Sequence, residues 1–179
     1  MIPGVLLTGG ASRRMGTDKA TLPLGDATFA TRAAAVLATV CAPVVEVGPG
    51  LTGLRAVRED PVGSGPLAAF LAGVDALAAP GSVFLLACDL PFVDAVTLAA
   101  VADHAGAGSV VPVVAGRPQY ACARWSAAAI AAGRAALGAG ERALRVLADV
   151  DAESLAADAL APLLADVDTP EDLRRLGLS

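Results

Sequence analysis

Two glycines and three cations follow the first apolar run of the chain. Residues 5–20 read VLLTGGASRRMGTDKA, and Lys19 is the only lysine of the chain. Glycines such as Gly9 and Gly10 let a backbone approach a ligand closely and turn its N–H groups inward. Arg14 can grip phosphate oxygens in a fork, and Lys19 adds a compact point charge. These groups predict a triphosphate site rather than a surface turn, although the spacing matches neither a P-loop nor GxGxxG.

A second candidate is Asp89, which comes near the end of the apolar run SVFLLACDLP at residues 82–91. A carboxylate at the end of a buried strand is costly unless it is paired or bound to a metal. Mg²⁺ takes one or two carboxylates together with phosphate oxygens and water. Asp89 could instead belong to a helix cap, because Pro91 and Asp94 follow it. Beside the Gly/Arg/Lys loop, magnesium binding is the preferred interpretation.

Three further residues are candidate contacts. Asp60 follows an Arg-Glu pair at the end of another expected strand. A carboxylate there can accept hydrogen bonds from N1–H and the exocyclic amine of guanine; the alternative is an ordinary surface acid. Gly65, in the segment GSGPLA at 63–68, offers a base or ribose a turn and a helix start, or forms an ordinary loop. Asp168, in an Asp-Thr-Pro-Glu turn, is a capping-region acid that could also reach the metal.

Apolar strands and helical segments alternate along the chain, and they must position these side chains. Such alternation predicts one Rossmann-like α/β domain over residues 1–179, with a mostly parallel sheet and helices on both faces. Ligands of such sheets bind beyond the carboxyl ends of the strands. The expected strands are 4–9, 43–47, 54–57, 82–91, two within 109–125, and one at the start of 163–178. The expected helices are 27–40, 65–79, 94–105, 126–138, 141–150 and one capped by Thr169.

Composition and charge exclude several classes of protein. The chain has 179 residues, is 55 % hydrophobic and carries a net charge of −5, which argues against a nucleic-acid partner. The acidic excess lies in residues 151–179, so any anion site is local. Three scattered cysteines fit neither a disulfide framework nor a zinc site. Without a signal peptide or an apolar run near the roughly 18 residues of a membrane span, we expect a soluble cytoplasmic protein without a membrane partner.

The motifs together resemble a known family. LLTGGASRRMGTDKA is similar to the signature of nucleotidyltransferases that activate small phosphorylated molecules, and most similar to that of the molybdenum cofactor guanylyltransferases. REDPVGSGPLAAFLAG, LLACDLPFV, VVPVVAGRPQYACARW and DVDTPEDL resemble later segments of this family in the same order, over nearly the whole chain. The double glycine with GPLA favours the guanylyl branch over the cytidylyl branch.

The resemblance implies a fold of the nucleotide-diphospho-sugar transferase type and a Mg²⁺-dependent reaction. GMP would pass from GTP to the phosphate of molybdenum-molybdopterin, with release of pyrophosphate, and molybdoenzyme maturation proteins would be further partners. Catalysis would rest on Lys19, Arg14 and Asp89, and the metal on Asp89 and Asp168. The implied nucleotide contacts are Leu7, Thr8, Gly9, Gly10, Lys19, Asp60, Gly65 and Asp89.

The chain departs from the family pattern at a few positions. Thr8 stands where alanine is usual, and Ala69 where a glycine follows GPLA. Val47 stands where some members carry an asparagine that contacts the nucleotide. Asp166 and Asp168 stand where others carry asparagines. At these positions the implied nucleotide contacts and the second metal ligand would differ from those of other family members.

The chemistry needs no general base, because a phosphate monoester is already anionic near neutral pH. Catalysis is then positioning and charge neutralisation, which agrees with a single histidine, His104, late in an expected helix. Three alternatives remain open: a molybdopterin cytidylyltransferase, another nucleotidyltransferase of small phosphate monoesters, and a non-catalytic nucleotide-binding protein.

Overall fold

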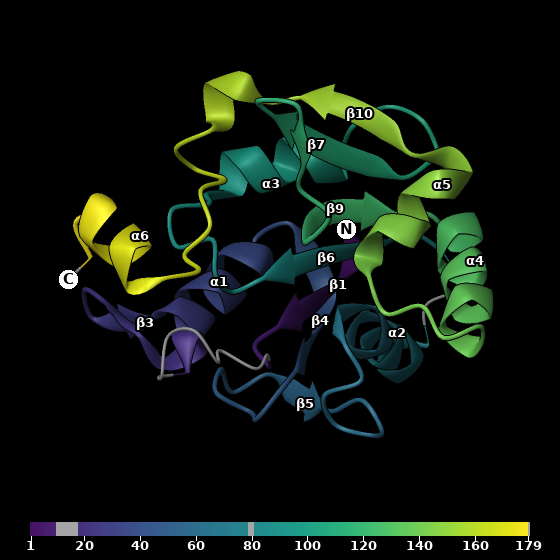
Figure 1. The fold of residues 1–179 in the computed structure, drawn as a ribbon, viewed down its shortest axis with the longest axis horizontal. Coiled ribbons are helices and arrows are strands. Elements are labelled where there is room, and N and C mark those ends of the chain that lie inside the picture. The colour runs from purple at the N-terminus through teal and green to yellow at the C-terminus, as the bar shows by residue number, and fades with distance from the viewer. Residues whose placement is uncertain (10–17, 79–80, 179) are drawn as a thin grey trace.

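The strands of the protein form a central sheet with helices on both faces (Figure 1). The computed structural model describes residues 1–9, 18–78 and 81–178. The strands are β1 (Ile2–Leu7), β2 (Pro23–Leu24), β3 (Ala27–Thr28), β4 (Cys41–Val47), β5 (Arg55–Val57), β6 (Val83–Ala87), β7 (Val110–Val114), β8 (Arg117–Pro118), β9 (Cys122–Trp125) and β10 (Glu153–Ala156). Strands β2 and β3 form a separate hairpin.

Side chains cap the N-termini of most of the α-helices in the described residues. The α-helices are α1 (Phe29–Leu37), α2 (Pro66–Leu77), α3 (Ala95–Ala102), α4 (Ala127–Gly138), α5 (Ala148–Asp151) and α6 (Pro170–Arg175). The 3₁₀ turns are η1 (Lys19–Thr21), η2 (Leu144–Leu147) and η3 (Asp158–Leu160). Thr28, Asp94, Ser126 and Thr169 each accept a hydrogen bond from a first-turn N–H, which satisfies a donor that the helix itself cannot. Thr169 caps α6, as the sequence predicts, whereas α2 and α5 have no side-chain cap.

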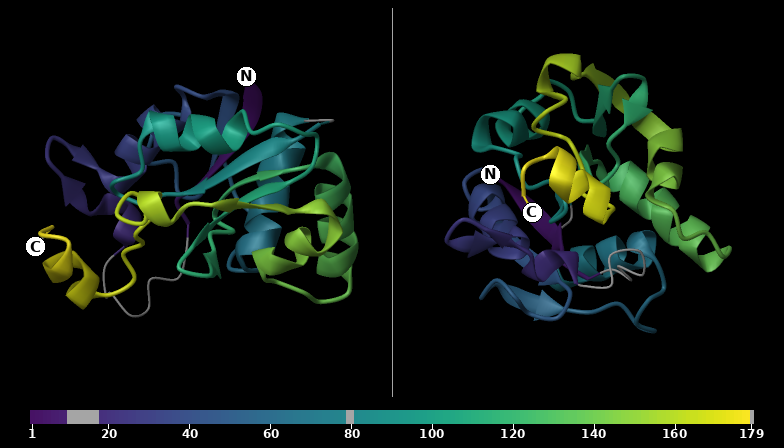
Figure 2. Two further views of the ribbon diagram at one scale, coloured as in Figure 1. Left: turned by 90° about the horizontal axis from the view of Figure 1, so that it is seen from above. Right: turned by 60° about the vertical axis from the view of Figure 1, so that its left-hand side comes forward.

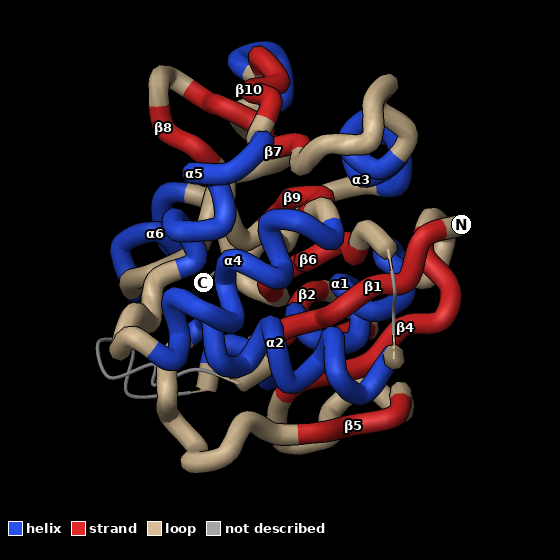
Figure 3. Tube along the Cα trace, turned by 90° about the vertical axis from the view of Figure 1, so that its right-hand side faces the viewer, coloured by secondary structure: helices blue, strands red, loops and turns tan. Residues whose placement is uncertain are grey.

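The strand order is β5-β4-β1-β6-β9-β7-β10, with β8 paired to β7 (Figure 3). The pairs β1–β4, β1–β6, β4–β5 and β7–β10 are parallel, and β9 runs antiparallel to both β6 and β7. The predicted α/β architecture with a mostly parallel sheet is therefore confirmed. Along the chain, strands β4 and β5 are added on one side of β1, and β6 is then added on its other side. The strand order therefore reverses between β1 and β6, and open sheets of this kind bind ligands at such a switch point.

Helices lie on both faces of the sheet (Figure 2), and a hydrophobic cluster fills the space between the sheet and the helices on each face. Leu6, Phe84 and Leu86 pack against α1 and α3, whereas Val5 and Leu85 pack against α2 and α4. Successive strand residues point to opposite faces, so apolar runs without alternation are what a sheet covered on both sides requires. Complete burial of each large side chain contributes about 1.5–3 kcal/mol.

Two predicted elements differ from the structure. The segment 141–150 was expected as one helix, but it holds the 3₁₀ turn η2 followed by the short α5. Leu144 and Leu147, spaced by three, are both buried, and a spacing of three fits a 3₁₀ turn.

The strand expected at the start of 163–178 is wrong. Leu164 and Val167 are buried there without a strand, and the edge strand β10 precedes them instead, paired with β7. Apolar content alone did not distinguish a strand from a coil packed over the core. None of the helices in the described residues has the length and apolar character needed to cross a membrane.

Candidate active site

A pocket of about 260 Å³ opens at the carboxyl ends of β1 and β6. The strands meet there in register, and the Cys88 N–H donates to the Leu7 carbonyl at 3.1 Å. The pocket therefore combines the end of β1, the end of β6 and the turn η1. Its lining is Leu7, Thr8, Gly9, Asp18, Lys19, Ala20, Pro66, Ala87, Cys88, Asp89, Ala121 and Leu144.

Five of the predicted nucleotide contacts line this one pocket. They come from three separate elements, and they are Leu7, Thr8, Gly9, Lys19 and Asp89. Asp18 places Lys19, because its carboxylate accepts the Ala20 N–H at 3.1 Å and so starts η1. Gly10 and Arg14, predicted beside them, lie outside the described residues.

Two predicted contacts lie away from this pocket. Gly65 stands just before Pro66, which lines the pocket, and has φ = +98°; a Cβ there would come within 3.0 Å of Arg142 Cβ. Glycine at this position thus has a structural reason of its own. Asp60 is exposed and lines a different pocket, of about 780 Å³, between α2, α4 and β5. The structure does not bring Asp60 together with Lys19 and Asp89.

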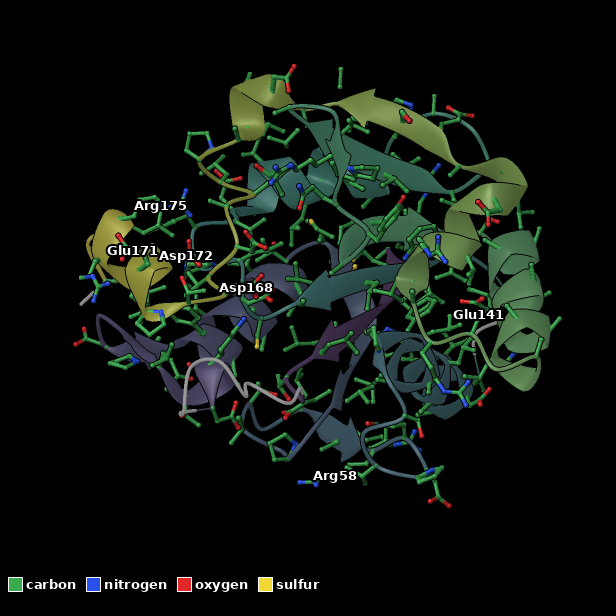
Figure 4. The ribbon with its side chains drawn as sticks, viewed as in Figure 1. Arg58, Glu141, Asp168, Glu171, Asp172 and Arg175 are labelled. Atoms are coloured by element: carbon green, nitrogen blue, oxygen red, sulfur yellow. The ribbon has the colours of Figure 1, made fainter. Side chains whose placement is uncertain are left out.

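Lys19 pairs with Asp168, which the sequence analysis assigned to the metal. The Lys19 Nζ donates to Asp168 Oδ1; the lysine side chain is 16 % exposed and the aspartate 53 %. Asp168 lies on the segment that leads into α6, on the side toward which β6 points (Figure 4). The same segment is tied to the strand end, because the Val167 N–H donates to the Asp89 carbonyl at 3.0 Å.

The surroundings of the Asp89 carboxyl disfavour its charged form. Its pKa is raised to about 6: burial is the largest cause of the rise, Lys19 opposes it, and the neighbouring acids Asp168 and Asp166 add to it. A carboxylate in this state gains from a nearby cation, because a cation favours its charged form. This surrounding fits the predicted role in magnesium binding.

The donor set suits a metal that binds together with a phosphate ligand. Among residues 1–9, 18–78 and 81–178, no group of three or more His, Cys, Asp or Glu side chains could hold a metal ion. The assignment of Asp89 and Asp168 as the metal ligands stays a prediction, and it would supply two carboxylates. Mg²⁺ characteristically takes one or two carboxylates and completes its shell with phosphate oxygens and water.

The end of β1 is held by hydrogen bonds to β4. The Thr8 and Gly9 N–H groups donate to the Val47 carbonyl at 3.1 and 3.2 Å, so both amides already have protein partners. The Thr8 hydroxyl donates to Glu46 Oε1 at 2.6 Å. Glu46 was missed from the sequence, where an acid inside the run PVVEV was its only signal. Val47 is buried in the core beside α2, so its side chain does not replace an asparagine contact.

A second pocket, of about 370 Å³, adjoins the first and shares Gly9 and Asp18 with it. Gly48 and Pro49 from the loop after β4, and Arg58, Glu59, Val62 and Gly63 from the loop after β5, complete its lining. Two adjoining pockets at one switch point offer room for a ligand with a polyphosphate and a further group.

The chain is similar to known proteins over most of its length. The family model described as MobA-like NTP transferase domain matches residues 4–167. A probable molybdenum cofactor guanylyltransferase of Mycobacterium tuberculosis is 36 % identical, over 92 % of this chain and 85 % of the relative. The molybdenum cofactor guanylyltransferase of Rhodobacter capsulatus is 34 % identical, over 97 % of this chain and 94 % of the relative.

A solved structure has the same fold. Molybdopterin-guanine dinucleotide biosynthesis protein A of Archaeoglobus fulgidus superimposes with a TM-score of 0.76 at 21 % identity, covering 98 % of this chain and 96 % of the other. The match of the family model over most of the chain, together with these relatives, shows that the protein belongs to the MobA-like NTP transferase family and is a nucleotidyltransferase.

Proposed function

We propose that the protein transfers GMP from GTP to the phosphate of molybdenum-molybdopterin and releases pyrophosphate, in a reaction that depends on Mg²⁺. The observation that carries the proposal is the shared pocket of Lys19 and Asp89 at the ends of the neighbouring strands β1 and β6. The names of relatives that cover most of the chain support the guanylyl group and the molybdenum cofactor as substrates.

The residues of the chain act by holding and neutralising charge. Lys19 exchanges its partner Asp168 for phosphate oxygens and stabilises the negative charge that grows there during transfer. Arg14, outside the described residues, is proposed to grip the same triphosphate. Asp89, with Asp168, would hold Mg²⁺, which when bound neutralises phosphate charge.

The acceptor phosphate is its own nucleophile, so the site needs positioning more than proton transfer. His104 agrees with this: it lies near Glu153 on the edge strand β10, with its Nε2 3.5 Å from Glu153 Oε2, and it does not line the pocket. Base recognition by Asp60 stays a prediction, and the pocket beside Gly9 is a second place where a base could bind.

The direct test mixes the protein with molybdenum-molybdopterin, Mg²⁺ and each of GTP, CTP, ATP and UTP, and measures pyrophosphate and the dinucleotide product. We expect turnover with GTP, and a larger rise of Tm with GTP than with the other nucleotides, because ligand binding stabilises the folded state. A larger response to CTP would make the protein a cytidylyltransferase. Absence of any nucleotide response would overturn the proposal.

A further inference from the structure

Glu46, at the end of β4, is a charged residue in the interior that the proposed chemistry does not use. Its exposed fraction is 0 %. An isolated carboxylate in such a place is strongly unfavourable, so donors must surround it. None of the ion pairs formed by the described residues includes Glu46. The donors are therefore dipoles rather than cations.

Most of these donors come from the loop after β4. The N–H groups of Gly50, Leu51 and Thr52 donate to the carboxylate at 2.8, 2.9 and 3.0 Å, and the Thr52 hydroxyl donates at 2.7 Å. Gly50 has φ = +87°, which lets successive amides converge on one anion. Burial raises the pKa of Glu46, but the hydrogen bonds from Thr8, Thr52 and the loop amides outweigh it and lower the pKa below its usual value.

The remaining donor comes from β1. Thr8 donates its hydroxyl to Glu46 Oε1 at 2.6 Å across the parallel pair β1–β4. Gly48 also packs directly against the Thr8 hydroxyl, because a Cβ added to Gly48 would lie 2.1 Å from Thr8 Oγ1. Glu46 thus connects the end of β1 to the loop after β4; we call Glu46, Thr8 and residues 50–52 the Glu46 clamp.

The Glu46 clamp holds residues that line the two adjoining pockets or lie next to their lining. Thr8 and Gly9 line the pocket of Lys19 and Asp89, and Gly9, Gly48 and Pro49 line the second pocket. We infer that Glu46 is a positioning residue for nucleotide binding, which fixes the end of β1 against the loop after β4 without touching the ligand. This inference rests on the proposed function, because it takes a nucleoside triphosphate as the ligand of both pockets.

The test compares E46Q and T8A with a matched control. Asp151 is a similar caged carboxylate, accepting from Ser109 at 2.8 Å and Ser126 at 2.7 Å at the opposite edge of the sheet, so D151N should lower stability without changing nucleotide affinity. Calorimetry with GTP and Mg²⁺ should give a Kd raised about fivefold or more for E46Q and T8A, as for the loss of one or two hydrogen bonds. Hydrogen exchange of the Gly50, Leu51 and Thr52 amides should accelerate in E46Q but not in D151N.

The double variant T8A/E46Q shows whether the effect passes through the Thr8–Glu46 contact. If it does, the double variant binds GTP no more weakly than E46Q alone, because residues that act through one contact are not additive. Faster exchange in E46Q with wild-type affinity in both single variants would make the clamp purely structural and overturn the inference. A wild-type protein that binds no nucleoside triphosphate would instead overturn the proposed function, and the clamp's role with it.

Discussion

The ammonium of Lys19 forms an ion pair with the carboxylate of Asp168, 149 residues further along the chain. Lys19 lines the pocket and Asp168 does not, so a triphosphate bound in the pocket would compete with Asp168 for the same cation. Opening a partly exposed pair costs little, because such pairs contribute about 1 kcal/mol or less. On the proposed function, Asp168 would hold Lys19 in place before binding and release it to the more highly charged triphosphate.

Lys19→Ala should lower kcat/KM by about tenfold or more, because a charge that stabilises the transferring phosphoryl group is removed. The fold should persist, since Lys19 lines a pocket rather than the core. Lys19→Arg should restore activity only in part, because a planar fork replaces a point charge. The control is Arg174→Ala, which removes an exposed cation of α6 that pairs with Glu171. Equal turnover of Lys19→Ala and wild type in steady-state assays would contradict the role.

Asp168→Asn should tighten binding of GTP in EDTA, because the competitor for Lys19 loses its charge. With Mg²⁺ the same variant should bind GTP somewhat less well, since an amide oxygen is a weaker magnesium ligand than a carboxylate. Calorimetry in EDTA and in Mg²⁺ separates the two effects. Glu171→Gln, which removes an exposed charge of α6, is the control. Unchanged affinity in EDTA would show that the ion pair does not compete with the nucleotide.

Asp89→Asn should lower kcat by about a hundredfold or more, while GTP binding in EDTA stays the same or tightens. The reason is that a bare carboxylate facing a triphosphate repels it unless a cation intervenes. GTP affinity should then no longer depend on Mg²⁺ as it does in the wild type. Binding that weakens equally in Mg²⁺ and EDTA would assign Asp89 to the nucleotide or to the fold, and not to the metal.

The free energy of unfolding of the metal-free protein should depend on pH through the ionisation of Asp89. Its pKa is raised from 3.8 to about 6, so between these values the folded state binds more protons than the unfolded state. The contribution of Asp89 to the free energy of unfolding therefore falls as the pH rises from about 4 to about 6, by on the order of 2–3 kcal/mol.

Asp89→Asn removes that dependence, so the advantage of the variant over wild type should grow across this range and level off above it. Urea unfolding at a series of pH values in EDTA measures the difference directly. Comparing the two proteins cancels the opposite contribution of Glu46 and Asp151, whose pKa values are lowered. A difference that does not change between pH 4 and 7 would contradict the raised pKa.

The parts of the site that could be predicted from sequence are those marked by a change of residue type at a strand end. Lys19 and Asp89 each follow an apolar run, and the general rule for parallel sheets then predicts that they meet. Asp168 was found as a candidate, but its pairing with Lys19 depends on how the last segment crosses the strand ends, which no local pattern specifies.

Glu46 could not be recognised for a different reason. Its carboxylate accepts hydrogen bonds from the backbone amides of a loop. Nearly every residue type has a backbone N–H, so the sequence does not show which amides will surround a carboxylate. The segment 141–150 shows the same limit for the fold, because the apolar spacing of three between Leu144 and Leu147 is compatible with both an α-helix and a 3₁₀ turn. Tertiary packing under Leu144 and Leu147 decided between them.

The segment that carries Val167 and Asp168 has a consequence for how the protein is made. Ribosomes deliver a chain from its N-terminus, so β1, Lys19 and Asp89 are all synthesised before this segment. The hydrogen bond from Val167 to Asp89 and the ion pair between Lys19 and Asp168 therefore form later than the parallel pairing of β1 with β6 can. The two strand ends of the site can be aligned first, and the segment that ties Lys19 and Asp89 together is added to them afterwards.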